Sequence, residues 1–184
     1  MWIYEKSLQH PVRIERPNPR LAGLIITALG GPDGELGAAM RYLNQRYTMK
    51  DGRVIGILTD VGSEELGHME MVGSIVYQLT RNLTPDEIRA GGFDKYYVDN
   101  GAAIYPASAS GVPFNAASIA SKEDRLASIS EDIAAEQKAR AMYDNILRLS
   151  DDPDVNDVIK FLRQREVVHL QRFGEAMRIL LDNK

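Results

Sequence analysis

Residues 63–71 have the sequence SEELGHMEM, which puts Glu65 and His68 three positions apart in a segment that is otherwise apolar at helical spacing. Apolar residues recur every three or four positions between 54 and 79, so we expect a helix over about 53–80 with one face toward a core. Glu65 and His68 lie on that face, where a bundle helix ordinarily carries apolar side chains. The face consists of Val54, Leu58, Val61, Glu65, His68, Val72, Ile75 and Leu79.

The same pattern returns near the C-terminus. A helix predicted over about 155–181 carries Glu166 and His169 on its apolar face. A further predicted helix, over about 122–149, turns one glutamate, Glu136, inward. Its expected inner face consists of Leu126, Ile129, Ile133, Glu136, Arg140, Tyr143 and Leu147. An N-terminal helical segment is interrupted at residues 30–34, GGPDG, because glycine is a poor helix former and proline suits a restart, so Glu35 begins its second part.

The intervals between these residues repeat. Glu35 is followed by Glu65 at plus 30 and His68 at plus 33, and Glu136 is followed by Glu166 and His169 at the same intervals. Two tyrosines repeat as well, since Tyr42 follows Glu35 by seven residues and Tyr143 follows Glu136 by seven. We interpret the two halves as a repeated geometry.

Four carboxylates and two imidazoles on inward faces indicate a metal site. A Glu and a His three positions apart on a helix lie about 60° apart around its axis, so both can reach one ion. Two such pairs plus one Glu from each of two other helices form the two-metal site of ferritin-like di-iron and di-manganese proteins. Four unpaired carboxylates in an apolar core would otherwise be very unfavourable. Oxygen and nitrogen donors suit manganese or iron, and the residue types leave both open.

The rest of the sequence excludes several classes of function. The 184 residues are 44% hydrophobic and 26% charged, which fits one globular domain over 1–184. The net charge of -4 and the absence of a basic cluster argue against a nucleic-acid partner. Without cysteine, disulfides and thiolate metal sites are excluded. No apolar run resembles a signal peptide or a membrane span, so we expect a soluble protein made in the cytoplasm.

The predicted topology is all-α: two helical hairpins joined by one long crossover, forming a ferritin-like four-helix bundle. Residues 1–17 form an N-terminal arm and residues 81–121 form the crossover. A connection of that length is uncommon unless it packs or carries function. Its aromatic residues, which indicate packing, are Phe93, Tyr96, Tyr97, Tyr105 and Phe114.

Several neighbours of the predicted ligands have two interpretations. Tyr42 and Tyr143 are either core aromatics or hydroxyl donors to a ligating Glu. Arg140, one turn beyond Glu136, is a candidate charge partner for it. His10 has no comparable context, and we expect it at the surface or in packing. Four acidic residues near the motifs point off the inner faces, so they are expected to be solvated or paired: Glu64, Glu70, Glu131 and Asp132.

Four segments together resemble the manganese catalases, and in particular the short spore-coat branch of that family: GGPDGELGAAMRYLNQRY, TDVGSEELGHMEM, EDIAAEQKARAMYDNI and REVVHLQRF. The resemblance extends to residues 1–22, to GVPF at 111–114 and to residues 150–166, so it spans nearly the whole chain.

The resemblance implies a ferritin-like bundle that disproportionates hydrogen peroxide at a non-haem centre of two manganese ions. It also implies a homo-oligomer deposited in a spore coat with other coat proteins. Carried over by position, Glu35 and His68 bind one ion, Glu136 and His169 bind the other, and Glu65 bridges them. Glu166 becomes an unligated acid and base, and Tyr42 matches a position beside the ligands. Longer members carry a C-terminal extension that wraps neighbouring subunits. This chain stops at Lys184, which leaves a hexamer and a calcium site in that extension open.

Two alternatives from other classes stay open. A di-iron oxidase or ferroxidase would use the same six residues with Glu166 as a ligand. A structural coat protein would keep the site as a vestige, or use bound metal only to stabilise the bundle.

Overall fold

The computed structural model describes residues 7–96, 104–119 and 122–182, and helices dominate these ranges. The α-helices are α1 (Pro19–Gly30), α2 (Glu35–Gln45), α3 (Gly52–Thr80), α4 (Pro85–Ala90), α5 (Arg125–Leu149) and α6 (Pro153–Asp182). Short 3-10 turns cover Arg46–Thr48, Asp94–Tyr96 and Ala116–Ser118. Within the described ranges no strand forms, and the one β contact is an isolated bridge between Ala107 and Pro113. No described helix is long and apolar enough to span a membrane.

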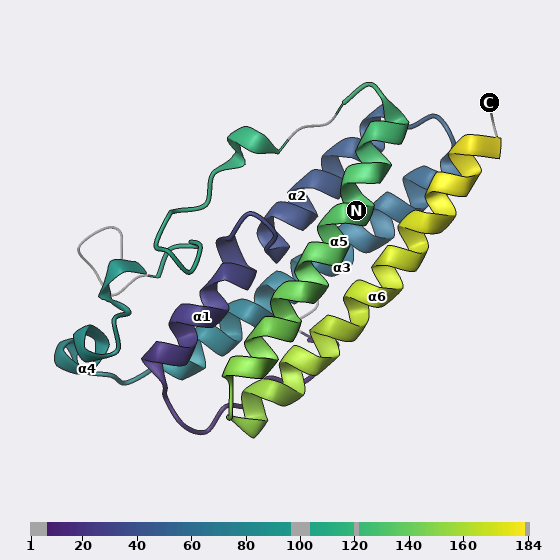
Figure 1. The fold of residues 1–184 in the computed structure, drawn as a ribbon. Helices are drawn as coiled ribbons and strands as arrows, with labels where there is room; N and C mark the ends of the chain where they lie inside the picture. The colour runs from purple at the N-terminus through teal and green to yellow at the C-terminus, as the bar shows by residue number, and fades with distance from the viewer. Residues whose placement is uncertain (1–6, 97–103, 120–121, 183–184) are drawn as a thin grey trace.

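The long helices form a four-helix bundle (Figure 1). α1 and α2 follow one another along α3 and make one hairpin with it, and α5 makes the second hairpin with α6. The hairpins meet where α3 packs on α6 and where α1 packs on α5. The predicted all-α, ferritin-like architecture of two hairpins and a crossover is confirmed.

Side-chain caps set where the helices start. Asn18, Asp51 and Asp124 each accept a hydrogen bond from a backbone N–H in the first turn of α1, α3 and α5. Such caps satisfy donors that would otherwise lack partners. The cap at Asp124 starts α5 at Arg125, three residues later than the expected start at 122. α6 begins at Pro153, two residues earlier than expected, where the carboxylate of Asp152 accepts from the N–H groups of Asp154 and Val155.

The break between α1 and α2 falls at the predicted glycines. Gly31 N–H still donates to Thr27, and Gly34 N–H donates to Gly31, so the chain turns tightly before α2. Glu35 is the first residue of α2. Its carboxylate therefore lies near the positive end of that helix dipole, which favours negative charge.

The crossover packs through part of its aromatic set. Phe93 and Tyr96 are buried, and the Tyr96 hydroxyl donates to the carbonyls of Gly23 and Ala109. Phe114 is half-buried, whereas Tyr105 is 45% exposed, so the expectation of packing is wrong for that residue. Tyr97 lies outside the described residues. The described crossover therefore docks on α1.

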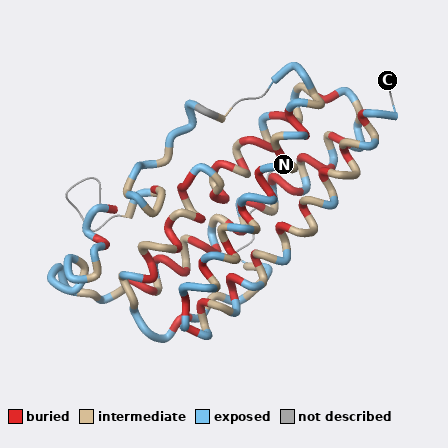
Figure 2. The backbone as a smooth tube through the Cα atoms, viewed as in Figure 1, coloured by how far each residue is buried: buried red, intermediate tan, exposed pale blue. Residues whose placement is uncertain are grey.

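The core has two apolar clusters with a polar layer between them. Its buried residues lie along the inner faces of the bundle helices (Figure 2). One cluster joins α1 to the later half of α3, the end of α5 and the start of α6. The other joins α2 to the first half of α3 and the end of α6. Every residue expected on the inner faces of α3 and α6 is buried. Between the two clusters these faces carry Glu65, His68, Glu166 and His169.

Candidate metal centre

The polar layer brings together the six residues that the sequence singled out as a metal cluster. None is more than 2% exposed: Glu35, Glu65, His68, Glu136, Glu166 and His169. They come from α2, α3, α5 and α6, one Glu from each single-Glu helix and one Glu/His pair from each of the others. The repeated intervals in the sequence thus correspond to one buried cluster in the bundle interior.

Glu65 lies between the two imidazoles. Its Oε2 atom is 2.8 Å from Nδ1 of His68, and its Oε1 atom is 2.8 Å from Nδ1 of His169. The two rings are stacked, with centroids 5.4 Å apart and an interplanar angle of 22°. One carboxylate therefore offers one oxygen to each histidine.

The single glutamates pair with different histidines. Glu35 Oε2 is 3.9 Å from Nδ1 of His68, and Glu136 Oε2 is 3.6 Å from Nδ1 of His169. The cluster therefore divides into two half-sites that share Glu65, and both imidazoles turn the same nitrogen, Nδ1, toward the carboxylates.

The donor set fits bound metal. Ligand atoms of Glu65, His68, Glu166 and His169 all lie within 4.8 Å of one another. Several inward atoms make no aligned hydrogen bond within the described chain, although three of them lie at ion-pair distance from one another: Glu65 Oε1, Glu136 Oε2, Glu166 Oε1 and His169 Nδ1. Buried polar atoms normally have partners. Carboxylate oxygens and an imidazole nitrogen that lie close together without aligned hydrogen bonds are suited to a divalent cation such as manganese or iron.

Electrostatics in the cluster separate charged from neutral groups. Burial alone would lower the pKa of His68, but contacts with Glu64 and Glu65 outweigh burial and raise that pKa to about 9. The charge of Glu65 has the same effect on His169, whose pKa rises to about 12 against the effect of burial. Burial would raise the pKa of Glu65, yet the two imidazoles hold it well below its usual range. When no metal is bound, these shifts favour an ionised Glu65 carboxylate between two protonated imidazoles.

Two other glutamates are pushed toward their neutral forms. Burial, followed by the charge of Glu65, raises the pKa of Glu35 well above its ordinary value. Burial, followed by the charges of Glu35 and Glu136, does the same to Glu166. A buried carboxyl with a raised pKa can hold a proton near neutral pH and give it up on demand.

Each of the two tyrosines donates a hydrogen bond across the bundle to a glutamate of the other hairpin. The Tyr42 hydroxyl donates to Glu136 Oε1 at 2.5 Å, and the Tyr143 hydroxyl donates to Glu35. Each tyrosine thus contacts the single glutamate of the opposite hairpin, although in the sequence it lies seven residues after the glutamate of its own. Of the two interpretations of these residues, the contacts favour the hydroxyl donor.

Arg140 does not pair with Glu136, so that interpretation is wrong. Its guanidinium donates instead to Asp144 at 2.8 Å and to Gln137 at 3.2 Å. Asp132, expected to be solvated or paired, is fully buried, and its carboxylate oxygens have no hydrogen-bond partner in the described chain. Both differences have one cause: the inner face of α5 is rotated by about one position from the expected face.

Glu64 was expected to be solvated or paired, and it is paired, but beside the cluster. Its carboxylate lies 3.4 Å from Nε2 of His68 and 3.2 Å from Nε2 of His169. Arg165 and Gln9 also bind it. Burial would raise the pKa of Glu64, but His169, His68 and Arg165 hold it well below its usual range. The sequence analysis did not identify Gln9 or Arg165 as neighbours of the cluster. The repeat could have indicated Arg165, because it precedes Glu166 as Glu64 precedes Glu65.

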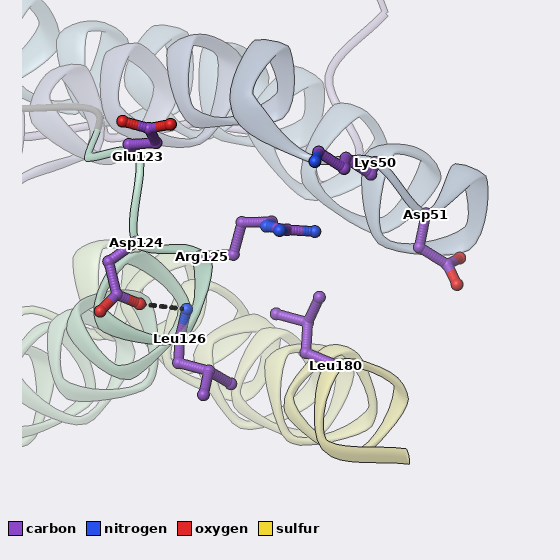
Figure 3. Close-up of a pocket in the computed structure, with 7 residues that line it drawn as sticks. All are labelled: Lys50, Asp51, Glu123, Asp124, Arg125, Leu126 and Leu180. Atoms are coloured by element: carbon purple, nitrogen blue, oxygen red, sulfur yellow. Dashed lines mark hydrogen bonds between the residues drawn. The ribbon is translucent and has the colours of Figure 1, made fainter. Parts of the chain in front are cut away.

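A surface pocket of about 610 Å³ lies away from this cluster (Figure 3). Its lining residues are Lys50, Asp51, Glu123, Asp124, Arg125, Leu126 and Leu180, from the starts of α3 and α5 and the end of α6. Asp124 already caps α5 through the N–H of Leu126. No residue of the buried cluster lines the pocket, so we assign no chemistry to it.

A four-helix bundle with such a Glu/His cluster in its interior is typical of ferritin-like proteins that bind metal through carboxylates and imidazoles. The comparisons with known proteins give the family. The family model described as manganese containing catalase matches residues 1–184. The chain therefore belongs to the manganese catalase family.

Individual relatives agree with that assignment. The chain is 52% identical to Protein CotJC of Bacillus subtilis, over all of this chain and 97% of that one. It is 35% identical to a probable manganese catalase of Clostridium acetobutylicum, over 96% of this chain and 80% of that one. The crystal structure of KatB, a manganese catalase from Anabaena, superposes with a TM-score of 0.89 at 29% identity, covering 98% of this chain and 81% of that one.

Proposed function

We propose that the protein is a non-haem dimanganese catalase that converts two molecules of hydrogen peroxide into two of water and one of oxygen. The observation that carries the proposal is the position of Glu65, with one carboxylate oxygen 2.8 Å from Nδ1 of each of two buried histidines. One carboxylate placed in this way is suited to bridge two ions.

Each half-site supplies its own further ligands. Glu35 and His68 would hold one ion, and Glu136 and His169 the other, as their proximity supports. When bound, two manganese ions would supply the redox chemistry, by which two electrons taken from one peroxide are returned to the next, so no organic reductant would be needed. The ions also balance the buried carboxylate charge, which would otherwise be costly.

Glu166 is the proposed acid and base. Peroxide loses protons when it is oxidised to oxygen, and protons must be supplied when the O–O bond is reduced to water. Glu166 is buried within the cluster, its Oε1 atom has no hydrogen-bond partner in the described chain, and its pKa is raised. It can therefore hold a proton between the two half-reactions.

The tyrosines hold two of the proposed ligands in place. Tyr42 donates to one oxygen of Glu136, and Tyr143 donates to one oxygen of Glu35. The second oxygen of each carboxylate is directed toward a histidine. Such contacts orient ligands and tune the metal.

The proposal extends to the setting of the protein. The resemblance to the spore-coat branch, together with 52% identity to Protein CotJC over nearly its whole length, supports a coat-associated peroxide scavenger. Membership of the manganese catalase family supports a homo-oligomer. The mass of the purified protein by light scattering tests the second point.

The test of function is oxygen release from hydrogen peroxide by protein loaded separately with manganese and with iron, with bound metal counted in each sample. We expect two manganese ions per chain and rapid oxygen release from the manganese sample. Iron-specific oxidation would favour the di-iron oxidase. Full manganese loading without oxygen release would favour a structural coat protein, and either result would reject the proposal.

A matched pair of variants tests the role of Glu166. Glu166→Gln should keep both manganese ions and lose about 10²- to 10⁴-fold in turnover, the usual contribution of a general acid and base. Glu175→Gln, on the exposed side of the same helix, should match the wild type. Loss of metal in Glu166→Gln would instead identify Glu166 as a ligand.

A further inference from the structure

The residue that precedes each ExxH pair forms a contact between the halves of the bundle. Glu64 precedes Glu65 on α3, and Arg165 precedes Glu166 on α6, so the two occupy equivalent positions with opposite charges. Nε of Arg165 donates to Oε1 of Glu64 at 2.6 Å, and Nη2 donates to Oε2 at 3.1 Å. Two parallel, charge-assisted hydrogen bonds of this kind fix the orientation of a carboxylate as well as its position.

The Glu64 carboxylate lies on the outer side of both imidazoles. Its Oε1 is 3.4 Å from Nε2 of His68, and its Oε2 is 3.2 Å from Nε2 of His169. The inner nitrogens, Nδ1, are both 2.8 Å from Glu65. Each ring is therefore flanked by Glu65 on the inside and Glu64 on the outside, and Glu64 is shared by the two rings as Glu65 is.

The two histidines differ in their other support. The amide of Gln9, from the N-terminal arm, donates to Glu64 Oε1 at 3.1 Å, and its oxygen lies 3.1 Å from Nε2 of His68 as a hydrogen-bond partner. For Nε2 of His169, the described chain offers the carboxylate of Glu64 at ion-pair distance but no aligned hydrogen bond. His68 thus has two polar neighbours on its outer side, and His169 depends on Glu64.

We propose that Glu64 is the positioning residue for both metal-binding histidines. Its carboxylate lies 3.4 Å from Nε2 of His68 and 3.2 Å from Nε2 of His169, which favours a proton on Nε2 of each ring and leaves Nδ1 free to bind an ion. Arg165 holds the carboxylate in place. The inference rests on the proposed two-metal site. Outer carboxylates that contact ligating histidines typically contribute 10- to 100-fold to metal affinity. Because Gln9 supports only His68, the ion at Glu136 and His169 should depend more on Glu64 than the ion at Glu35 and His68.

The experiment measures manganese affinity and manganese content per chain in full-length variants. Glu64→Ala should weaken manganese binding by about 10- to 100-fold and leave a single ion at limiting manganese. Electron paramagnetic resonance should then show an isolated Mn(II) ion in place of a coupled pair. Adding His68→Ala to Glu64→Ala should remove the retained ion, whereas adding His169→Ala should not.

Three further variants separate positioning from general stability. Gln9→Ala should weaken the ion at His68 more than the ion at His169, because Gln9 contacts both His68 and Glu64. Arg165→Ala should weaken both ions less than Glu64→Ala does. Arg163→Ala is the matched control. Arg163 lies two residues before Arg165 on α6, and its ion pair with Asp144 is away from the histidines. The variant should bind manganese as the wild type does. If Glu64→Ala fails to fold, Gln9→Ala and Arg165→Ala decide the question by the same measurements.

Unchanged manganese affinity in folded Glu64→Ala, or in both Gln9→Ala and Arg165→Ala, would overturn the inference. A wild-type chain that binds two manganese ions but releases no oxygen from peroxide would overturn the proposed catalase function alone. A wild-type chain that binds no metal would overturn both.

Discussion

At the scale of single residues, the polar layer works because nearly every polar group in it has a partner of opposite charge or a hydrogen-bond donor. Glu65 faces two imidazoles, and the two single glutamates each receive a tyrosine hydroxyl. Two groups differ: Glu166, whose Oε1 atom has no hydrogen-bond partner in the described chain, and Asp132. Asp132 is fully buried on α5, one turn before Glu136, and both its oxygens lack a hydrogen-bond partner in the described chain. Gln45 and Arg41 act against the effect of burial on the pKa of its carboxyl group.

Asp132 gives a pH prediction. Burial raises the pKa of Asp132 well above its ordinary value, and Gln45 and Arg41 only partly oppose this. The folded state therefore binds this proton more tightly than the unfolded chain does, so its contribution to stability is lost as pH rises from the usual Asp range toward the folded pKa. Asp132→Asn should raise the free energy of unfolding at pH 8 by about 1 kcal/mol or more, and by less at pH 5.

Urea unfolding of the wild type and the variant at the two pH values checks this difference, with the metal content held constant. Asp60→Asn, at an exposed position of α3, is the control and should change stability little at either pH. The same gain for Asp132→Asn at pH 5 and pH 8 would contradict the prediction, because an amide replacing a permanently ionised carboxylate would act equally at both.

At the scale of helices, the sequence predicted α3 and α6 better than α5. The inner faces of α3 and α6 carry large apolar residues interrupted only by the Glu/His pairs, so periodicity alone identified them. The buried face of α5 consists of Ser128, Ile129, Asp132, Ala135, Glu136, Ala139, Tyr143 and Ile146. Small and polar residues occupy its centre, while Leu126, Ile133 and Leu147 lie half-buried at its side. Hydrophobicity therefore indicated the flank of the helix and placed Arg140 on the wrong face.

The buried Glu/His cluster was predictable for a different reason from its surroundings. Helical geometry places Glu and His of each ExxH pair on one face of one helix, and the equal intervals from Glu35 and from Glu136 indicated that the two hairpins repeat the arrangement. Gln9 and Arg165 reach Glu64 from other segments of the chain, 55 and 101 residues away. Contacts of that kind depend on how the helices pack and on the path of the N-terminal arm. Local periodicity contains neither.

The docking of the crossover on α1 also gives a prediction. A Cβ atom at Gly30 would lie 2.4 Å from the backbone of Pro106 and 2.5 Å from that of Ala107, so Gly30→Ala must displace the crossover. We expect it to destabilise the protein by about 1–3 kcal/mol, as overpacking does. Gly56→Ala on α3 is the matched control, since a Cβ there meets nothing within 4 Å, and it should stabilise by roughly 0.5–1 kcal/mol.

Thermal unfolding of the two glycine variants compares these effects directly. A crossover that packs loosely would let Gly30→Ala behave as Gly56→Ala does, with a raised melting temperature in both. Opposite signs would confirm that the end of α1 and residues 106–107 form one packed unit.

At the scale of the whole molecule, the polar layer divides the bundle into two apolar clusters that the same helices cross. Without metal, the pKa shifts favour an ionised Glu65 between two protonated histidines. They favour neutral carboxyl groups at Glu35 and Glu166. Metal that binds only the folded chain should therefore stabilise the entire bundle, since the layer links all four long helices. Removal of the metal should lower the melting temperature, and unfolding should remain a single cooperative transition.

The size of this effect follows from mass action. Free manganese at 100 times its dissociation constant stabilises a protein by about 2.7 kcal/mol for each site, and 1 kcal/mol corresponds to roughly 2–4 °C in a chain of this length. We therefore expect a rise of about 10–20 °C when manganese is added to chelated protein, measured by scanning calorimetry. Glu65→Gln, which keeps the shape of the side chain but not the bridging carboxylate, should lose most of that rise. An equal rise in Glu65→Gln would mean that manganese stabilises the fold from somewhere other than the space between the two histidines.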